Sequence, residues 1–305
     1  MNKKILSLGA AVVISGSLMI TSAFGAMSTT SAGYEALKTA HKQSHEIDNL
    51  TTNANLSIKD GGQSIVDLQS KFKINIDQSN SSGVIRMNQD GESFDIDLYA
   101  NQAQLVLKTS ESNTYYVVEH EESESDSDSR KHHSTHDPAM AEDAERIIDA
   151  LVGNYQNYFQ LEETSGDSSV VTLSMHDDEI PVLVRTLGSI LIKNATKEHS
   201  TSNEMELHSA FKPLHDISLP ELTEDIRLSG IDFKTVISSD QLIEQYDMLI
   251  TASGKDAEGA FHELEFNLQL NFSDYNQTQV DVINLHDVNV EKIDSEQFFQ
   301  HKSHH

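Results

Sequence analysis

Residues 66–77 read Val66-Asp67-Leu68-Gln69-Ser70-Lys71-Phe72-Lys73-Ile74-Asn75-Ile76-Asp77, with apolar side chains at the even positions apart from Ser70 and polar ones at the odd positions. Successive side chains of a β-strand point to opposite faces of its sheet, so this period of two predicts a long strand with one solvated face. The pattern returns near the C-terminus, where polar residues alternate with Leu264, Phe266, Leu268, Leu270 and Phe272. Two such strands predict an antiparallel sheet with one apolar face.

Shorter alternating segments surround the first of these strands. They cover residues 53–59, 83–89, 93–99, 104–109 and 114–119. Asp60-Gly61-Gly62 and Asp90-Gly91 separate neighbouring segments, and Asp-Gly between alternating runs is a strong hairpin signal. We therefore expect an antiparallel meander over residues 53–119.

A second group of strands is expected in the C-terminal half. It comprises a pair around Leu161 and residues 170–175, and then residues 226–233 and 245–253. The apolar residues change parity around Gly230, which predicts a β-bulge or bend there. Residues 196–222 are polar and we expect them to be irregular.

Three helices are expected from apolar residues that recur every three or four positions, over about 31–48, 137–158 and 179–195. The second begins at Asp137-Pro138, which supplies a helix N-cap and a proline in the first turn. Before it, residues 120–136 are acidic, Ser-rich and His-rich and contain no large apolar side chain. Because nothing in this segment can be buried, we expect a disordered, solvated loop.

The first residues have the composition of an export signal. Lys3 and Lys4 precede an uncharged, mainly apolar run over residues 5–20, and the small residues Ala23 and Gly25 stand where signal peptidase needs them. We expect residues 1–25 to be a signal peptide, cleaved after Gly25 or one residue later; the alternative is an uncleaved anchor. Cleavage implies a secreted protein, extracellular or associated with the cell wall.

Composition excludes several classes of function. The 305 residues include no Cys, and 49 Asp and Glu against 21 Lys and Arg give a net charge of −28. Without Cys there is no disulfide, thiol nucleophile, thiolate metal site or lipidated Cys. The negative field repels nucleic acid, and after the first 25 residues no run approaches the roughly 20 apolar residues of a membrane span. We expect neither a nucleic-acid partner nor stable membrane insertion.

The order of these elements, a helix, a run of antiparallel strands, two central helices and a second run of strands, resembles the bacterial lipoprotein-carrier superfamily of the LolA and LppX type. The resemblance covers residues 31–290 by element order and strand pattern, without a shared motif, and the Cys that is lipidated in LppX-type members is missing. It implies an α+β fold in which a curved antiparallel sheet forms an open half-barrel, covered by about three helices. The implied single domain spans 26–295, followed by a His-rich tail at 296–305.

The chain is also similar to uncharacterised secreted proteins of spore-forming bacteria, which open with a like signal followed by Ser-Thr-Thr, here residues 28–30, and a helix with Gly-Tyr, here Gly33-Tyr34. That similarity implies no activity. The LolA and LppX resemblance implies that the concave face binds acyl chains.

The candidate ligand-binding residues are the apolar side chains of the expected sheet face, because such a face requires a covering helix or an apolar ligand. They are Phe72, Ile74, Ile76, Phe94, Ile96, Leu98, Leu264, Phe266, Leu268, Leu270 and Phe272. The alternative is that the helices fill this space as an ordinary core and leave no cavity.

The candidate metal ligands are His132, His133 and His136, beside the acidic run. Further histidines are His301, His304 and His305 in the tail, and His41 and His45 one helical turn apart. A flexible loop fixes no coordination geometry, the Glu of a HExxH site is missing, and residues 121–128 lack the spacing of a calcium loop. We expect at most weakly bound divalent cations, and no other cofactor; the alternative is a purely solvated loop and tail.

Hydrolase and phosphate-binding signatures are not found in a convincing setting. The sequence therefore predicts a secreted, non-catalytic protein of the cell envelope that binds a lipidic or other apolar small molecule. Two alternatives remain open: a structural or matrix protein that acts on envelope components through its acidic surface, and a loose binder of divalent metals.

Overall fold

The computed structural model describes residues 31–44, 46–89, 91–119, 156–163, 168–196, 205–207, 211, 219–293 and 299–301. The predicted signal peptide, the loop at 120–136 and most of the His-rich tail lie outside the described residues. The same holds for His45 and for most of the helix predicted at 137–158.

Two α-helices occur in the described part of the chain, α2 (Ala32–Ser44) and α4 (Val182–Thr196). They confirm the helices predicted over 31–48 and 179–195, and the backbone N–H of Tyr34 donates to the Ser31 hydroxyl at 3.3 Å as an N-cap requires. The expected number of about three helices is too high for the described residues. Of the helix predicted at 137–158 they include only the 3₁₀ turn η2 (Gln156–Tyr158), and a second such turn, η3 (Asp177–Glu179), precedes α4.

Strands dominate the fold. The N-terminal meander consists of β1 (Asn49–Asp60), β2 (Gln63–Asn75), β3 (Asn80–Gln89), β4 (Glu92–Ala100), β5 (Gln104–Thr109) and β6 (Thr114–Glu119). The second group consists of β7 (Gln160–Glu163), β8 (Ser169–His176), β10 (Glu224–Ile237), β11 (Ile243–Lys255) and β12 (Phe261–Ser273). Shorter strands are β9 (Met205–Leu207), β13 (Asn289–Ile293) and β14 (Phe299–His301). The predicted meander is confirmed, and so is the bulge at Gly230, where the pairing of β10 with β11 changes register.

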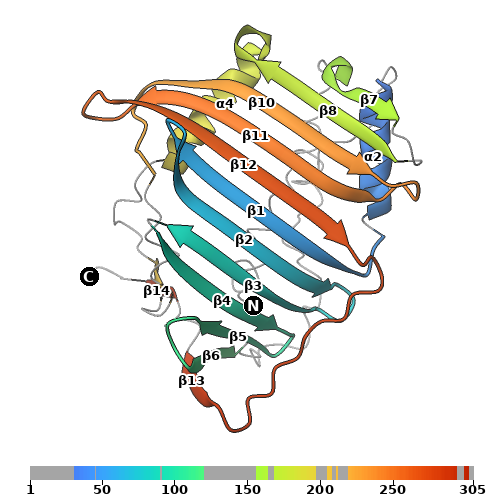
Figure 1. Ribbon diagram of the computed structural model, residues 1–305, viewed down its shortest axis with the longest axis vertical. Coiled ribbons are helices and arrows are strands. Elements are labelled where there is room, and N and C mark those ends of the chain that lie inside the picture. The colour runs from blue at the N-terminus through green and yellow to red at the C-terminus, as the bar shows by residue number, and fades with distance from the viewer. Residues whose placement is uncertain are drawn as a thin grey trace, which may run out of the picture.

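Twelve of these strands form one open sheet in the order β13-β6-β5-β4-β3-β2-β1-β12-β11-β10-β8-β7 (Figure 1). Neighbouring strands are antiparallel except β13 and β6, which are parallel. The strands β9 and β14 pair separately. Because β13 and β7 stand at opposite ends of the order, the sheet is not closed into a barrel.

The pairing register sorts the side chains onto two contrasting faces. One cross-strand row runs from β4 to β8 through Phe94, Met87, Leu68, Leu56, Leu268, Met248, Phe233 and Leu173. The adjacent row on the other face runs through Asp95, Arg86, Gln69, Asn55, Gln269, Asp247, Lys234 and Thr172. Both rows follow from a period of two in every strand. The sheet therefore has one apolar and one polar face, as the sequence predicts.

Both α-helices pack on the apolar face, behind the sheet in the view of Figure 1. The helix α2 contacts β7, β8, β10 and β11, and α4 contacts β10. In α4, Gly188 permits this approach, since a Cβ atom there would lie 2.6 Å from a methyl carbon of Leu228. The core of the protein thus lies between the apolar face and the elements on that side.

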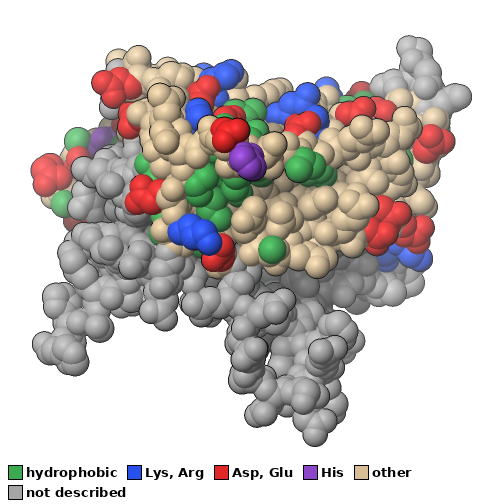
Figure 2. All heavy atoms as spheres, turned by 90° about the horizontal axis from the view of Figure 1, so that it is seen from below, with side chains coloured by type: hydrophobic (Ala, Val, Ile, Leu, Met, Phe, Trp, Pro, Cys, Tyr) green, Lys and Arg blue, Asp and Glu red, His purple; other side chains and the backbone are tan. Residues whose placement is uncertain are grey.

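The segment that joins β12 to β13, residues 274–288, passes over the polar face near the ends of β1, β2 and β3. Asp281 accepts a hydrogen bond from Lys73 at 2.8 Å, and its backbone N–H donates to Ser82. The hydroxyls of Thr278 and Thr51 lie 3.0 Å apart. Elsewhere acidic and basic side chains are interspersed on the described surface, as Figure 2 shows for the underside.

Candidate ligand-binding face

The structure places ten of the eleven predicted ligand-binding residues on the apolar face. They lie in β2, β4 and β12, three strands that are not all neighbours, and the register with β1 and β3 aligns them. Ile76 differs from the prediction. The strand β2 ends at Asn75, the side chain of Ile76 is 59% exposed, and its backbone N–H donates to the carbonyl of Asp48.

The ten aligned residues divide into a buried and a partly exposed group. Phe72, Phe94, Ile96, Leu98, Leu264 and Leu270 are buried and belong to the core. The ring of Phe72 lies over Gly83, where a Cβ atom would come within 2.3 Å of the ring. These residues therefore support the alternative of an ordinary core. Ile74, Phe266, Leu268 and Phe272 are only partly buried.

A contiguous patch of partly exposed apolar side chains lies in the middle of the sheet, on β1, β12, β11 and β10. Its members are Leu56, Leu268, Met248, Phe266, Ile250 and Ile231, called the central patch below. Leu268 pairs with both Leu56 and Met248, and Phe266 pairs with Ile250, which pairs with Ile231. Directly opposed side chains on one face lie within contact distance. The four strands thus bring six apolar side chains into one surface.

The sequence prediction includes only Phe266 and Leu268 from this patch. Met248 and Ile250 stand two residues apart in the predicted strand at 245–253, but Leu249 between them is also apolar, so the local pattern does not decide which of the three face the sheet's apolar side. Which strands lie side by side depends on the pairing of β1 with β12, two strands more than 200 residues apart, and no local pattern specifies it.

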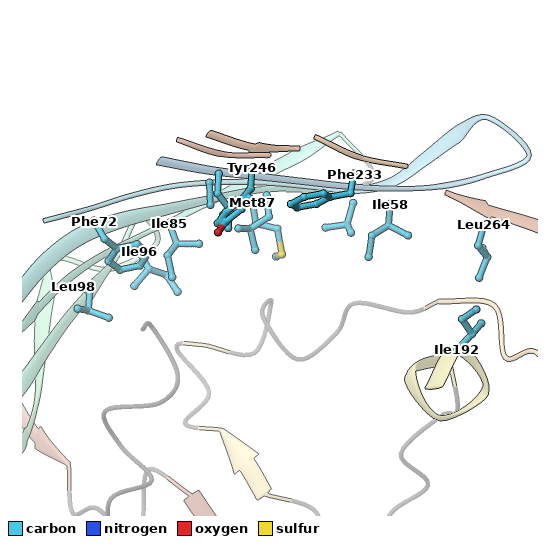
Figure 3. Close-up of a cluster of buried hydrophobic side chains, with 14 of the residues drawn as sticks. Ile58, Phe72, Ile85, Met87, Ile96, Leu98, Ile192, Phe233, Tyr246 and Leu264 are labelled. Carbon is cyan, nitrogen blue, oxygen red and sulfur yellow. The ribbon is translucent and has the colours of Figure 1, made fainter. Parts of the chain in front are cut away.

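The face around the central patch is apolar and the labelled side chains on it point the same way. Figure 3 shows Ile58, Met87, Phe233 and Tyr246 directed to one side of the sheet, and Ile192 of α4 across from Leu264. The two cross-strand rows that contain the patch carry no charged residue. Burial raises the pKa of the Tyr246 hydroxyl above its ordinary value. Such a surface offers dispersion and hydrophobic contact.

Three hydroxyls interrupt this apolar surface. Thr52, Ser70 and Thr109 are buried on it, and their side-chain oxygens have no hydrogen-bond partner among the described residues. An unpaired buried hydroxyl costs about 1–3 kcal/mol. Because these oxygens are buried, they add no polar contact to the exposed part of the face.

A Ser, a His and an Asp come together on the polar face, where β8 pairs with β10. The Ser174 hydroxyl donates to Asp232 at 2.6 Å, and Nε2 of His176 lies 3.0 Å from the other oxygen of that carboxylate. The Ser174 hydroxyl also lies 3.4 Å from Nδ1 of His176. A nucleophilic Ser gives its proton to a His base, whereas the shorter hydrogen bond of this hydroxyl goes to the carboxylate. His176 and Asp232 are exposed, so the cluster is a hydrogen-bonded surface network.

A second polar cluster joins two hairpin turns at one end of the sheet. Nδ1 of His262 lies 2.7 Å from Asp60, and its Nε2 lies 3.3 Å from Asp256. The hydrogen bond with Asp60, assisted by Asp256, raises the pKa of His262 above its ordinary value although burial lowers it. Burial alone would raise the pKa of Asp256, but hydrogen bonds from His262 and from backbone N–H groups of the turn hold it below its ordinary value.

The predicted metal ligands lie outside the part of the chain that the structure describes. His132, His133, His136, His304 and His305 lie outside the described residues, as does the side chain of His301. His41 is buried in α2. Within the described ranges no three His, Cys, Asp or Glu residues are grouped so that they could hold a metal ion. Nor does any described helix have the length and apolarity to cross a membrane.

Comparison with known proteins finds no matching protein family and no matching curated protein. Among solved structures, an uncharacterized conserved protein from Thermus thermophilus aligns over 86% of this chain and 100% of its own at 6% identity, with a TM-score of 0.25. MucB in complex with MucA(peri) aligns over 82% of this chain and 62% of its own at 8% identity and a TM-score of 0.23. A LolA superfamily protein from Nitrosomonas europaea aligns over 84% and 96% at 7% identity and a TM-score of 0.22. Likenesses at this level do not place the chain in a family.

Proposed function

We propose that this chain is a non-catalytic binding protein that holds a lipid acyl chain, or a small molecule of similar chemistry, against the apolar face of its sheet. The observation that carries the proposal is the central patch. Its six side chains form one surface and stay partly exposed, while residues around them in the same rows, such as Leu68 and Phe233, are buried. Contiguous exposed apolar surface on a folded chain is typical of a binding site.

The chemistry of the face favours an acyl chain over a polar ligand. A polar molecule would give up hydrogen bonds to water and find few partners here, at a cost of several kcal/mol. Each methylene group of an acyl chain that leaves water for such a surface gains about 0.8 kcal/mol. The long rows across β1, β12, β11 and β10 offer contact along the whole length of an extended ligand.

We further propose that the protein acts outside the cytoplasm, since residues 1–25 have the composition of a cleavable signal. A carrier or receptor of lipids in the cell envelope meets its ligand there. The proposal requires that the protein recovered from the culture medium begin at Ala26 or Met27.

Displacement of a fluorescent fatty acid tests the ligand class. We expect saturable binding of the probe, competition by unlabelled palmitate, and affinity at least about tenfold weaker in Leu268→Gln, because an amide there has no polar partner on the apolar face.

Asn267→Gln is the matched control, because Asn267 lies next to Leu268 on the same strand but on the polar face. It should bind as the unchanged protein does. No binding of the probe, or equal affinity in Leu268→Gln, would refute the proposed site.

A further inference from the structure

The outer surface of α4 is apolar, although the helix lies on the surface of the protein. Val182, Leu183, Leu187, Ile190 and Leu191 are all exposed, Val182 to 78% and Leu191 to 68%. Their spacing puts Leu183, Leu187, Ile190 and Leu191 in one stripe along the helix. This set, with Val182 beside it, is called the α4 stripe below.

The inner surface of the same helix is also apolar. Ile192 is buried, Val184 packs against the core, and Gly188 meets Leu228 of β10. A helix that is apolar on both sides is normally buried on both. The described residues cover only the inner side, so the α4 stripe is a surface with room for a partner.

Charges at the two ends of the stripe are of opposite sign. The helix itself contains no acidic residue and carries Arg185 near its start and Lys193 in its last turn. Just before it stand Asp177, Asp178 and Glu179, and the side chain of Asp178 is 98% exposed. Asp177 lies 3.0 Å from Arg227 and Asp178 lies 3.7 Å from Arg185 of the same chain. The three acidic side chains therefore leave an excess of one negative charge at this end, opposite Lys193 at the other.

We propose that the α4 stripe is the interface between two copies of this chain, packed antiparallel about a two-fold axis near Leu187. Leu183 and Leu191 lie four residues on either side of Leu187, so each Leu183 then faces a Leu191 of the other copy. The same arrangement brings Lys193 of one copy to the acidic turn of the other, within reach of its long side chain, and it opposes the two helix dipoles.

The size of the surface and its charge favour a second copy over a membrane. Two stripes with their flanking charges bury on the order of 1,000 Å², the lower bound for a specific interface. The net charge of −28 would oppose approach of this surface to anionic lipid.

Sedimentation equilibrium of the full chain over a wide range of concentrations measures this association. We expect a monomer–dimer equilibrium whose dissociation constant falls as NaCl is raised, because salt screens the repulsion between two acidic copies. Leu187→Glu places two carboxylates against each other on the axis and should weaken the dimer at least about tenfold. The control is Val282→Glu, which adds the same charge at an exposed position of the β12–β13 segment and should leave the dimer unchanged.

A charge exchange provides a second test that does not alter the apolar stripe. Lys193→Glu should weaken the dimer, and Asp178→Lys in the same chain should restore it. A monomer at every concentration, a dimer insensitive to Leu187→Glu, or a charge exchange without rescue would each overturn the proposal. Binding of the monomer to neutral phosphatidylcholine vesicles, lost in Leu187→Glu, would assign the stripe to a membrane instead.

Discussion

The side chain of His262 links two hairpin turns that are far apart in the sequence. Its ring bridges Asp60, which ends β1, and Asp256, in the turn between β11 and β12. Asp60 also accepts a hydrogen bond from the backbone N–H of Glu263 at 3.0 Å. The ring, when protonated, thus adds to the contacts between two hairpins that the pairing of β1 with β12 brings together.

The raised pKa of His262 predicts a definite pH dependence. A group with a raised pKa in the folded state contributes stability that is complete below its unfolded pKa, about 6.5 for His, and is lost as the pH rises through the folded pKa. The lowered pKa of Asp256 means that its share is lost as the pH falls through the acid range. We expect His262→Gln to lower the melting temperature by about 2–4 °C at mildly acidic pH.

Thermal unfolding of both proteins from mildly acidic to alkaline pH gives the measurement. The difference should shrink as the pH rises above the pKa of the folded His262. A difference that stays constant, or grows toward alkaline pH, would mean that the charge on the ring does not stabilise the turns.

The side chain of Phe72 shows what the sequence pattern can and cannot predict for a single residue. The period of two correctly places Phe72 on the apolar face, but it cannot show whether the ring faces a ligand or a neighbouring strand. The ring in fact lies over Gly83, directly across on β3. The Phe72 ring therefore packs against the neighbouring strand, because the register places Gly83, which has no side chain, directly opposite it.

At the scale of elements, the pair of β2 and β3 depends on this contact. A methyl group at position 83 would come within 2.3 Å of the Phe72 ring and 2.7 Å of the Lys71 carbonyl oxygen. Overpacking of this kind costs about 1–3 kcal/mol, so Gly83→Ala should lower the free energy of unfolding by that amount.

Urea unfolding measures the effect and a second variant tests its cause. In a Phe72→Leu background the added cost of Gly83→Ala should be smaller, although the Lys71 carbonyl still crowds the site. Additive costs would show that the ring is not what excludes the methyl group.

Elements with strong local periodicity are the ones that the sequence predicts well. The strands β5 and β6 have the bounds predicted for them, and β1, β3, β4, β10, β11 and β12 were predicted with shorter bounds. The strand predicted over 66–77 starts later than β2 and runs past its end at Asn75. The strand β13 was missed, since its five residues pair in parallel with β6 only after the chain has passed over the polar face. No local sequence pattern predicts that pairing, because it forms only when distant parts of the chain come together.

At the scale of the whole molecule, the candidate site arises from the order of the strands. The central patch joins β1, near the start of the described chain, to β10, β11 and β12, near its end. Alternation in the strands predicts an apolar face, and six of the eleven predicted ligand residues are buried in the core. Which apolar residues remain open depends on where α2 and α4 pack, and this is fixed only when the fold is complete.

We propose that the partly exposed apolar surface of the central patch holds an acyl ligand in the organism that makes the protein. Native mass spectrometry of the protein recovered from its producing organism tests it most directly. We predict a mass above that of the polypeptide by one or more lipid-sized ligands, released on denaturation and absent from Leu268→Gln. A mass equal to that of the polypeptide alone, unchanged after incubation with lipid, would contradict the claim.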